Sequence, residues 1–505
     1  MKNKIGFLFG AGAEIAYGLP SGGRFALDIF KMDPTPEKEK FREMLKNVDS
    51  RSAYASKWLP NDYQTKSIST FGKQQYEQLI VSSLENKRTK IIAFLNNFDC
   101  YASRIKTEFT NKEIDVDKNL ELLSGKKIGE VFFNKDIQLN KVLSDEIKLF
   151  DSKYFSILLE ILVNKKNKSS EVENIRNVIK SFIELLVGAV GEDFLHNLND
   201  TIFEKKPDDI DIFDDFCGFF SFEYNHISGL EIVLSNNDDT CTKESSPIEI
   251  VECFSKKLLE EIFAQSLDYQ SLIDSYYNYL FKPYSEWAKF CKICIFLMTV
   301  RDYIIKDRDI YIAKIKSNDG YYKDLMKISD SIHTIGTSNY NKFIEEFISK
   351  QNIHYLNGSV DDYYDPYKNK ILTEDEAKNS KHICVPLLFT QSGIKPLTSV
   401  VMSRRYVNYF DELSDCSVIL VLGYGCNSDD GHINGLLREI IEEKKKKVIL
   451  FSFDNSTIDD YISKLRIDNS NLLEVQKIST NRKIKNDSIY WYEDLLSTSA
   501  GAHTK

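Results

Sequence analysis

Two glycines near the start of the chain stand where backbone amide groups could bind a phosphate. The apolar run Ile5–Phe9 is typical of a buried parallel strand, and it breaks at Gly10 and Gly12. A helical segment then begins at Glu14. A strand, a glycine turn and a helix N-terminus together place N–H groups against a pyrophosphate. Gly10 permits the tight turn, and Gly12 has no Cβ to obstruct a ligand. The alternative is an ordinary tight turn between a strand and a helix.

The residues around this turn differ from the dehydrogenase fingerprint, which has a third glycine where this chain has Ile15. Instead, the run Gly-Ala-Gly-Ala-Glu is followed by Gly18-Leu19-Pro20. These residues resemble the first motif of the sirtuin family, whose Gly-Ala-Gly loop and Gly-Ile-Pro-like segment wrap NAD. The resemblance implies that NAD is bound here and that the following residues contact it: Gly10, Ala11, Gly12, Ala13, Glu14, Gly18 and Pro20.

A second segment, His333–Asn341, begins as a short strand and ends in turn residues, and an amphipathic helix is expected over Lys342–Ser349. It resembles the sirtuin Thr-x-Asn-(Tyr/Ile)-Asp motif at the mouth of the nicotinamide pocket, with Asn341 in place of the aspartate. The resemblance implies that Asn339 faces the nicotinamide ribose and that Tyr340 contacts the cofactor. An amide donates and accepts, which suits it to orient a water or a ribose hydroxyl. The alternative is an asparagine that caps the following helix.

The third segment, Ile353–Val360, departs from the family. It resembles the place where sirtuins carry a His-Gly dipeptide whose histidine is the general base on the nicotinamide ribose. The matching pair here is Asn357-Gly358. Because an amide takes up no proton at neutral pH, Asn357 cannot be that base, although it occupies the catalytic position. His354 is close in sequence, but residues 354 and 357 of one strand point to opposite faces, and a packed or capping histidine is the alternative.

Two further segments complete the resemblance. Val385–Leu397 resembles the proline-rich turn after the pocket in sirtuin-like bacterial proteins, which implies that Lys395 and Pro396 lie at the ligand mouth. Ser417–Gly423 is a continuous apolar strand, and a glycine-rich loop follows it. A helix over Gly435–Glu443 and a buried strand over Lys447–Phe453 come next. Open α/β sheets bind ligands at such strand ends.

The loop after this strand resembles the Gly-Tyr-(Ser/Gly)-x-x-x-Asp-x-His-Ile-Asn signature of bacterial sirtuin-like NAD-consuming proteins. The resemblance implies that NAD contacts Gly423, Tyr424, Asn427 and Asp430. His432 is a candidate for acid–base work at the rim of the site, and the alternative is that it caps the helix.

The stretch between the first two motifs is far longer than the roughly dozen residues that a parallel crossover needs. We therefore predict an α/β fold, a Rossmann-like parallel sheet interrupted by a large, mostly α-helical insertion. The NAD-binding domain comprises residues 1–31 and 330–505, and the insertion comprises 32–329. Apolar residues at three- and four-residue spacing predict helices in the insertion: Tyr76–Phe98, Leu143–Val163, Val172–Val190, Ile248–Leu267 and Trp287–Ile305.

Composition indicates a soluble, cytoplasmic protein. The net charge of −10 gives no electrostatic case for nucleic-acid or anionic-membrane binding, and no apolar stretch approaches the length of a membrane span. The nine cysteines have no disulfide-like spacing. Cys291 and Cys294 form the one Cys-x-x-Cys pair, and because no second pair follows, we expect core packing and no metal.

The resemblance favours an NAD+ hydrolase that releases nicotinamide and ADP-ribose. Bacterial relatives with large accessory regions act as antiphage effectors that cause abortive infection, which implies gating by the helical insertion, by homo-oligomerisation or by a regulatory partner. The departure at Asn357 leaves a second class open, a catalytically silent module that binds NAD or ADP-ribose. An NAD-dependent protein deacylase is disfavoured by Asn357 and by the missing zinc module.

Overall fold

The computed structural model describes residues 4–15, 17–20, 22–72, 75–76, 78–79, 82, 86–131, 147–164, 170–190, 227–235, 241–266, 275–348, 352–388, 399–427, 430–453, 456–468, 470–493 and 495. The chain divides into two compact units. The sheet unit comprises Met1–Gly22, Met32–Phe71 and Gln270–Lys505, and the helical unit comprises Gly23–Lys31 and Gly72–Tyr269. This division assigns residues 32–71 and 270–329 to the sheet unit. The domain boundaries expected from the sequence, with the insertion at 32–329, stay a prediction.

Six parallel strands form the main sheet, in the spatial order β3-β2-β1-β7-β8-β9. In chain order they are β1 (Ile5–Phe9), β2 (Ile332–Thr337), β3 (Asn352–Tyr355), β7 (Val418–Leu422), β8 (Lys447–Ser452) and β9 (Leu473–Lys477). Phe7 of β1 lies opposite Ile335 of β2 on one side and Leu420 of β7 on the other. Numbered among themselves, these strands run 3-2-1-4-5-6, the doubly wound order of Rossmann-type sheets. The predicted fold class is confirmed.

The other elements of the sheet unit are mostly helices and short antiparallel strands. Its helices are α1 (Gly12–Ile15), α3 (Thr35–Lys46), α4 (Ala53–Trp58), α17 (Trp287–Lys306), α18 (Arg308–Ser317), α19 (Tyr321–Leu325), α20 (Glu374–Lys378), α21 (Val400–Ser414), α22 (Gly431–Glu442) and α23 (Ile458–Leu465), with 3-10 turns η3 (Asn278–Phe281), η4 (Met326–Ser331) and η5 (Phe343–Glu346). A small sheet, β5-β4-β6, and a hairpin, β10-β11, complete it. Their bounds are β4 (Asp362–Asp365), β5 (Lys370–Thr373), β6 (Val385–Pro386), β10 (Lys483–Ile484) and β11 (Ile489–Tyr490).

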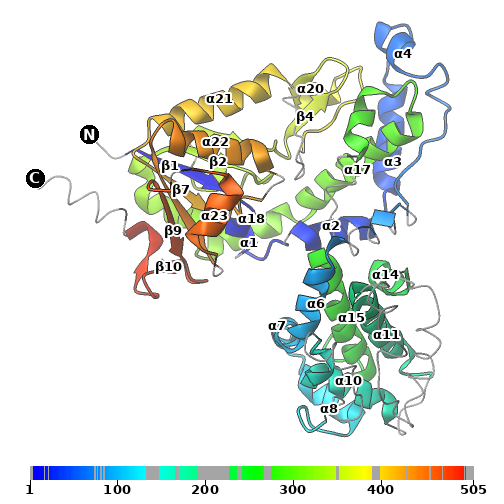
Figure 1. Cartoon of the computed structure of the whole chain (residues 1–505). Coiled ribbons are helices and arrows are strands. Elements are labelled where there is room, and N and C mark those ends of the chain that lie inside the picture. Colours follow the sequence, from blue (N-terminus) through cyan, green and yellow to red (C-terminus); the bar gives the residue numbers. More distant parts are fainter. Residues whose placement is uncertain are drawn as a thin grey trace, which may run out of the picture. The chain divides into compact units, whose positions relative to one another are not determined.

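Helices cover both faces of the main sheet (Figure 1), and each face has its own apolar core. Leu8 packs in the core formed with α21, α22 and α23. Phe7 and Phe9 point to the opposite core, where Phe9 meets the Tyr322 ring edge to face. Because successive side chains of a strand alternate between faces, burial on both sides requires the unbroken apolar run that β1 shows.

The helical unit is built on a long buried helix, α15, that packs against α8 and α11. Its elements are α2 (Gly22–Lys31, from Gly23 onward), α6 (Arg88–Asn96), α7 (Phe98–Thr110), α8 (Val116–Ser124), η2 (Leu149–Asp151), α10 (Lys153–Val163), α11 (Glu173–Val190), α14 (Ile227–Leu234) and α15 (Pro247–Ser266). Glu260 of α15 is 1% exposed and accepts from Arg24 of α2 at 2.7 Å and from Lys31. This buried carboxylate anchors α2 to the unit.

Some predicted helix bounds are wrong. The expected helix Tyr76–Phe98 runs past the end of α6 into the first residue of α7. The break lies at Asn97, because α6 stops at Asn96 and the Asn97 N–H bonds back to Phe94 O. Of the expected helix Leu143–Val163, residues 143–146 lie outside the described residues, and α10 begins at Lys153, where Ser152 caps it. The α17 prediction holds, with Cys291 and Cys294 buried in the core as expected. Within the described part of the chain, no helix is long and apolar enough to cross a membrane.

Candidate functional site

The carboxyl ends of β1 and β7 meet where the strand order of the main sheet reverses. The loops leaving these two strands are hydrogen bonded to each other: the Gly10 N–H donates to Leu422 O at 3.0 Å and the Gly12 N–H donates to Gly423 O at 2.9 Å. Open α/β sheets bind their ligands at this position, because the two loops leave toward opposite faces and open a crevice. The candidate site is therefore at this edge.

The three glycines of these loops permit the two backbones to touch. A Cβ at Gly12 would lie 2.8 Å from Gly423 Cα, and a Cβ at Gly423 would lie 2.0 Å from Ala13 N. Gly423 also has a φ of +67°, which favours glycine. We expected the amides of Gly10 and Gly12 to face a diphosphate, but they donate to the neighbouring loop. The glycine pattern thus has a packing reason that the sequence did not reveal.

Glu14 is buried at the start of α1 and is held by neutral donors. The Tyr322 hydroxyl donates to Oε1 at 2.7 Å, and the Asn341 amide donates to Oε2 at 3.2 Å. Burial raises the pKa of Glu14 to about 7, although the hydrogen bonds from Tyr322, Asn341 and Asn339 lower it. Asn341, which stands where the sirtuin motif has an aspartate, donates to this carboxyl group.

Asn339 joins the end of β2 to the first glycine turn. Its Nδ2 lies 3.1 Å from Gly10 O and 3.2 Å from the Tyr322 hydroxyl, and its backbone N–H donates to Thr337 Oγ1. The side chain is 6% exposed. It does not cap a helix, because η5 begins after Lys342 with no side-chain cap. The expected helix Lys342–Ser349 is wrong over its described part, residues 342–348, where the short 3-10 turn η5 forms instead.

Asn357 and His432, two predicted catalytic positions, are in direct contact. His432 Nε2 lies 3.2 Å from Asn357 Oδ1, and Asn357 Nδ2 donates to Ser338 O at 3.4 Å. An amide oxygen only accepts, so Nε2 carries the hydrogen and a neutral His432 ring has its lone pair on Nδ1. The ring of Tyr406, from α21, meets the His432 ring edge to face. His432 is the second residue of α22.

The loop between β7 and α22 is tied together by its own side chains. The Tyr424 hydroxyl donates to Asn434 Oδ1 at 2.8 Å, and Asn434 Nδ2 donates to Asn427 O at 2.7 Å. The Asp430 N–H donates to Asn427 O at 3.1 Å, and Asp430 is buried. Tyr424, Asn427 and Asp430 thus belong to one bonded loop beside Gly423.

The remaining predicted residues have different surroundings. Gly358 has a φ of +82°, and a Cβ there would lie 2.0 Å from Leu387 O. Tyr340 O accepts from Val360 N at 3.1 Å. Gly18 has a φ of +87°, Ala11 is exposed, and Pro20 is half-buried. Lys395 and Pro396 lie outside the described residues.

His354 does not join the Asn357–His432 pair. Its Nε2 lies 2.7 Å from Glu412 Oε2 on α21, and its ring packs near Tyr409. The packed role is confirmed. No sequence pattern marks Tyr322 or Tyr406, because each reaches the site from a helix outside the motifs, α19 and α21. Among the described residues, no cluster of His, Cys, Asp and Glu could hold a metal ion.

No protein-family model matches the chain. No curated protein matches it either. Among solved structures, the chain is similar to Sir2Tm bound to a propionylated peptide, at 14% sequence identity and a TM-score of 0.21, over 32% of this chain and 73% of that one.

Proposed function

We propose that the chain binds NAD+ at the carboxyl edge of the main sheet and hydrolyses the nicotinamide–ribose bond. The observation that carries this proposal is the convergence of four strand ends at the switch point. Asn339 bonds to Gly10 O, and Gly12 N bonds to Gly423 O. Asn357 bonds to Ser338 O. NAD+ is the substrate, and the reaction needs no metal. NAD+ contacts the residues predicted from the sequence motifs, except that the backbone amides of Gly10 and Gly12 are already bonded to the β7 strand end and its loop.

The reaction we propose relies on positioning and on one proton acceptor. Cleavage of the nicotinamide–ribose bond develops positive charge on the ribose and has a good leaving group, so alignment and activation of a water suffice. Asn357 contacts the ring of His432 at 3.2 Å, and His432 is the proposed acceptor of the proton from the water. Asn339 Oδ1 orients that water. Asp430 and Gly358 line the rim.

The test is the loss of NAD+ in the presence of the full chain. Purified protein is incubated with NAD+, and nicotinamide and ADP-ribose are measured by mass spectrometry; cellular NAD+ is measured in parallel on induced expression. We expect Asn339→Ala to lower the rate by at least a hundredfold, because it removes the water-orienting group and the bond to Gly10. The matched control is Asn318→Ala, at an exposed position after α18. Because the activity is expected to be restrained, the cellular assay is repeated in cells challenged with phage. Intact NAD+ there, as well as in the first two assays, would contradict the hydrolase proposal.

A catalytically silent binding module is the second candidate. Two observations favour it. The Asn339 side-chain amide already bonds to Gly10 O and to the Tyr322 hydroxyl. The side chain at position 357 is an amide, which cannot act as a general base. Such a module would bind NAD+ or ADP-ribose without turnover. Isothermal titration separates the two candidates, since stoichiometric binding with no product after extended incubation supports the module.

We further propose the biological setting implied by the sequence motifs. An NAD+ hydrolase inside a bacterial cell is toxic, so its activity has to be restrained until infection, as in an antiphage abortive-infection effector. The restraint would come from the helical unit, from oligomerisation or from a partner protein in the cytoplasm. Deacylase activity ranks last, and turnover of an acylated peptide would reverse that order.

A further inference from the structure

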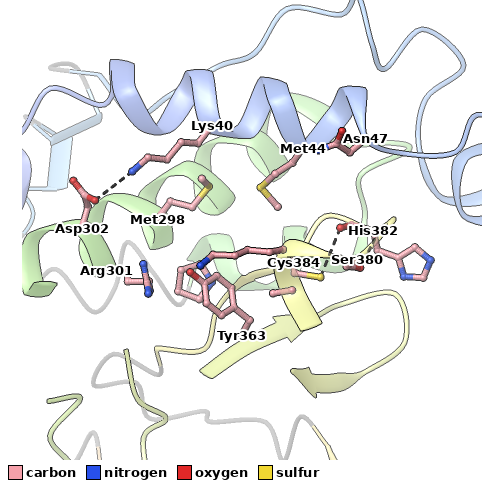
Figure 2. Close-up of a pocket in the computed structure, with 13 residues that line it drawn as sticks. Lys40, Met44, Asn47, Met298, Arg301, Asp302, Tyr363, Ser380, His382 and Cys384 are labelled. Atoms are coloured by element: carbon pink, nitrogen blue, oxygen red, sulfur yellow. Dashed lines mark hydrogen bonds and ion pairs between the residues drawn. The ribbon is translucent and has the colours of Figure 1, made fainter. Parts of the chain in front are cut away.

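A cavity of about 200 Å³ lies in the sheet unit between α3, α17 and the small sheet β5-β4-β6 (Figure 2). None of its lining residues belongs to the candidate NAD site. Met44 and Met298 point into the space that α3, α17 and β4 enclose, and Tyr363 lies across from them. An apolar cavity of about 150 Å³ is enough for one benzene ring. This cavity therefore has the size for a molecule with a single ring.

The apolar part of the wall suits an aromatic ring. Methionine sulfur makes favourable contacts with aromatic rings, and its flexible chain adapts to a flat ligand. Met44 and Met298 are both half-buried, so their side chains can move toward a ligand without displacing the core. Tyr363 offers a ring face or edge for stacking.

The balance of positive and negative charges differs between the two ends of the cavity wall. Lys40 lies 3.3 Å from Asp302 and 3.0 Å from Glu37, so two carboxylates surround one cation there. Arg301 and Lys378 instead share the single carboxylate of Glu374, at 3.3 Å and 3.1 Å. An excess positive charge remains at the Arg301–Lys378 end.

The guanidinium of Arg301 is held in place and keeps donors for a ligand. Its Nε donates to Val360 O at 2.7 Å, and its Nη2 faces Glu374. A guanidinium has five N–H groups in a fork that matches a carboxylate. The described contacts of Arg301 use two of its nitrogens, and the group lies over the Tyr363 ring at 5.2 Å.

The same arginine connects the cavity to the loop of the candidate site. Val360, which accepts from Arg301, donates its own N–H to Tyr340 O, next to Asn339. On the other side of the loop, Leu387 follows the cavity residue Pro386 and donates to Asp362 O at 2.8 Å. The loop 356–362, which contains Asn357, is thus fastened to two walls of the cavity.

We infer that this cavity is a second ligand site, which takes a small aromatic carboxylate. The ring lies between Met44, Met298 and Tyr363, and the carboxylate is bound by Arg301 and Lys378. Occupation of the site restrains the loop 356–362 through the Arg301–Val360 bond. This inference does not depend on NAD+ hydrolysis.

Benzoate is the probe, with benzamide and acetate as matched comparisons. Benzamide keeps the ring and lacks the charge, and acetate keeps the charge and lacks the ring. Isothermal titration of the full chain is expected to give one benzoate per chain, with a Kd at least tenfold below those of benzamide and acetate. Equal binding of benzoate and benzamide, equal binding of benzoate and acetate, or no benzoate binding would each overturn the assignment.

Variants locate the bound benzoate. Lys378→Gln, at an exposed side chain, is expected to weaken benzoate several-fold and to leave benzamide unchanged, whereas Lys381→Gln, exposed and outside the cavity, leaves both unchanged. Met298→Trp fills the space from a half-buried position and is expected to abolish binding. Benzoate binding that is unaffected by Lys378→Gln and Met298→Trp would place the ligand elsewhere.

Hydrogen exchange tests the link to the loop. Benzoate is expected to slow amide exchange in residues 356–362 and to leave α23, which lines neither site, unchanged. Bound benzoate without added protection of that loop would overturn the coupling.

Discussion

His432 Nε2 lies 3.2 Å from Asn357 Oδ1, so a side-chain hydrogen bond joins the loop after β3 to the first turn of α22. These residues belong to motifs that are far apart in the sequence. Their contact places a titratable ring beside the position where the sirtuin motif has its histidine.

A double-mutant cycle measures this contact. Asn357→Ala and His432→Ala are made singly and together, and unfolding is followed by tryptophan fluorescence, because Trp58, Trp287 and Trp491 are the chain's three tryptophans and all belong to the sheet unit. We expect a coupling free energy of about 1 kcal/mol, the usual net value of one hydrogen bond. The control cycle pairs Asn357→Ala with His354→Ala, which bonds to Glu412 instead and should be additive. Equal coupling in both cycles would contradict the contact.

The buried carboxyl of Glu14 makes stability depend on pH. Burial raises the pKa of Glu14 to about 7 from its ordinary value of 4.5, so the folded chain holds a proton that the unfolded chain releases. The contribution of Glu14 is fully present below pH 4.5 and is lost as pH rises to 7. A shift of this size corresponds to about 3 kcal/mol.

Glu14→Gln removes this dependence, because glutamine does not titrate. Between pH 4.5 and pH 8, the unfolding free energy of the variant minus that of the wild type is expected to rise by about 3 kcal/mol. Urea titrations at several pH values, followed by tryptophan fluorescence, measure this difference in unfolding free energy. Glu39→Gln, on the exposed side of α3, is the control and should leave the difference flat. A flat difference for Glu14→Gln as well would mean that Glu14 is ionised in the fold.

The strands of the main sheet could be predicted from the sequence because they are buried on both faces. The run Ile5–Phe9 is β1 to the residue. The expected strand at 417–423 exceeds β7 by one residue at each end, and the one at 447–453 exceeds β8 by one residue. An unbroken apolar run bounded by glycine or lysine has few other interpretations. The motifs also placed Asn339 and Asn357 at strand ends, which is where β2 and β3 put them.

The contacts that organise the site could not be predicted, because they come from residues outside the motifs. Tyr322 reaches Glu14 and Asn339 from α19, and no local pattern marks it. The helix expected at Lys342–Ser349 is only η5, since periodicity identifies the buried Phe343 and Ile344 but not the tighter hydrogen-bond spacing of a 3-10 turn. The packing of Gly12 on Gly423 likewise depends on tertiary structure.

Gly423→Ala is expected to destabilise the sheet unit. The added Cβ would lie 2.0 Å from the Ala13 backbone nitrogen, and the φ of +67° disfavours alanine. Overpacking against backbone and the left-handed conformation together predict a loss of about 3 kcal/mol or more. Gly431→Ala is the matched control, because it begins α22 and a Cβ there meets no atom within 4 Å. Urea unfolding monitored by tryptophan fluorescence compares them, and equal stability of the two variants would contradict the close contact of the two loops.

The last prediction concerns the helical unit, where one buried carboxylate has two cations. Burial alone would raise the pKa of Glu260, but Arg24 and Lys31 hold it below its usual value, so its contribution is present at neutral pH and is lost as pH falls. Glu260→Gln removes the buried carboxylate shared by the two cations and is expected to cost about 3 kcal/mol; the cost is limited because Arg24 is 33% exposed and keeps Asp28 at 3.0 Å. Glu261→Gln breaks the adjacent pair with Arg104, which is 56% exposed, and should cost below about 1 kcal/mol. Limited proteolysis within 72–269 reports on the unit directly, since it contains no tryptophan. Faster cleavage in Glu260→Gln than in Glu261→Gln is the expected outcome, and equal rates would mean that α2 is not anchored through Glu260.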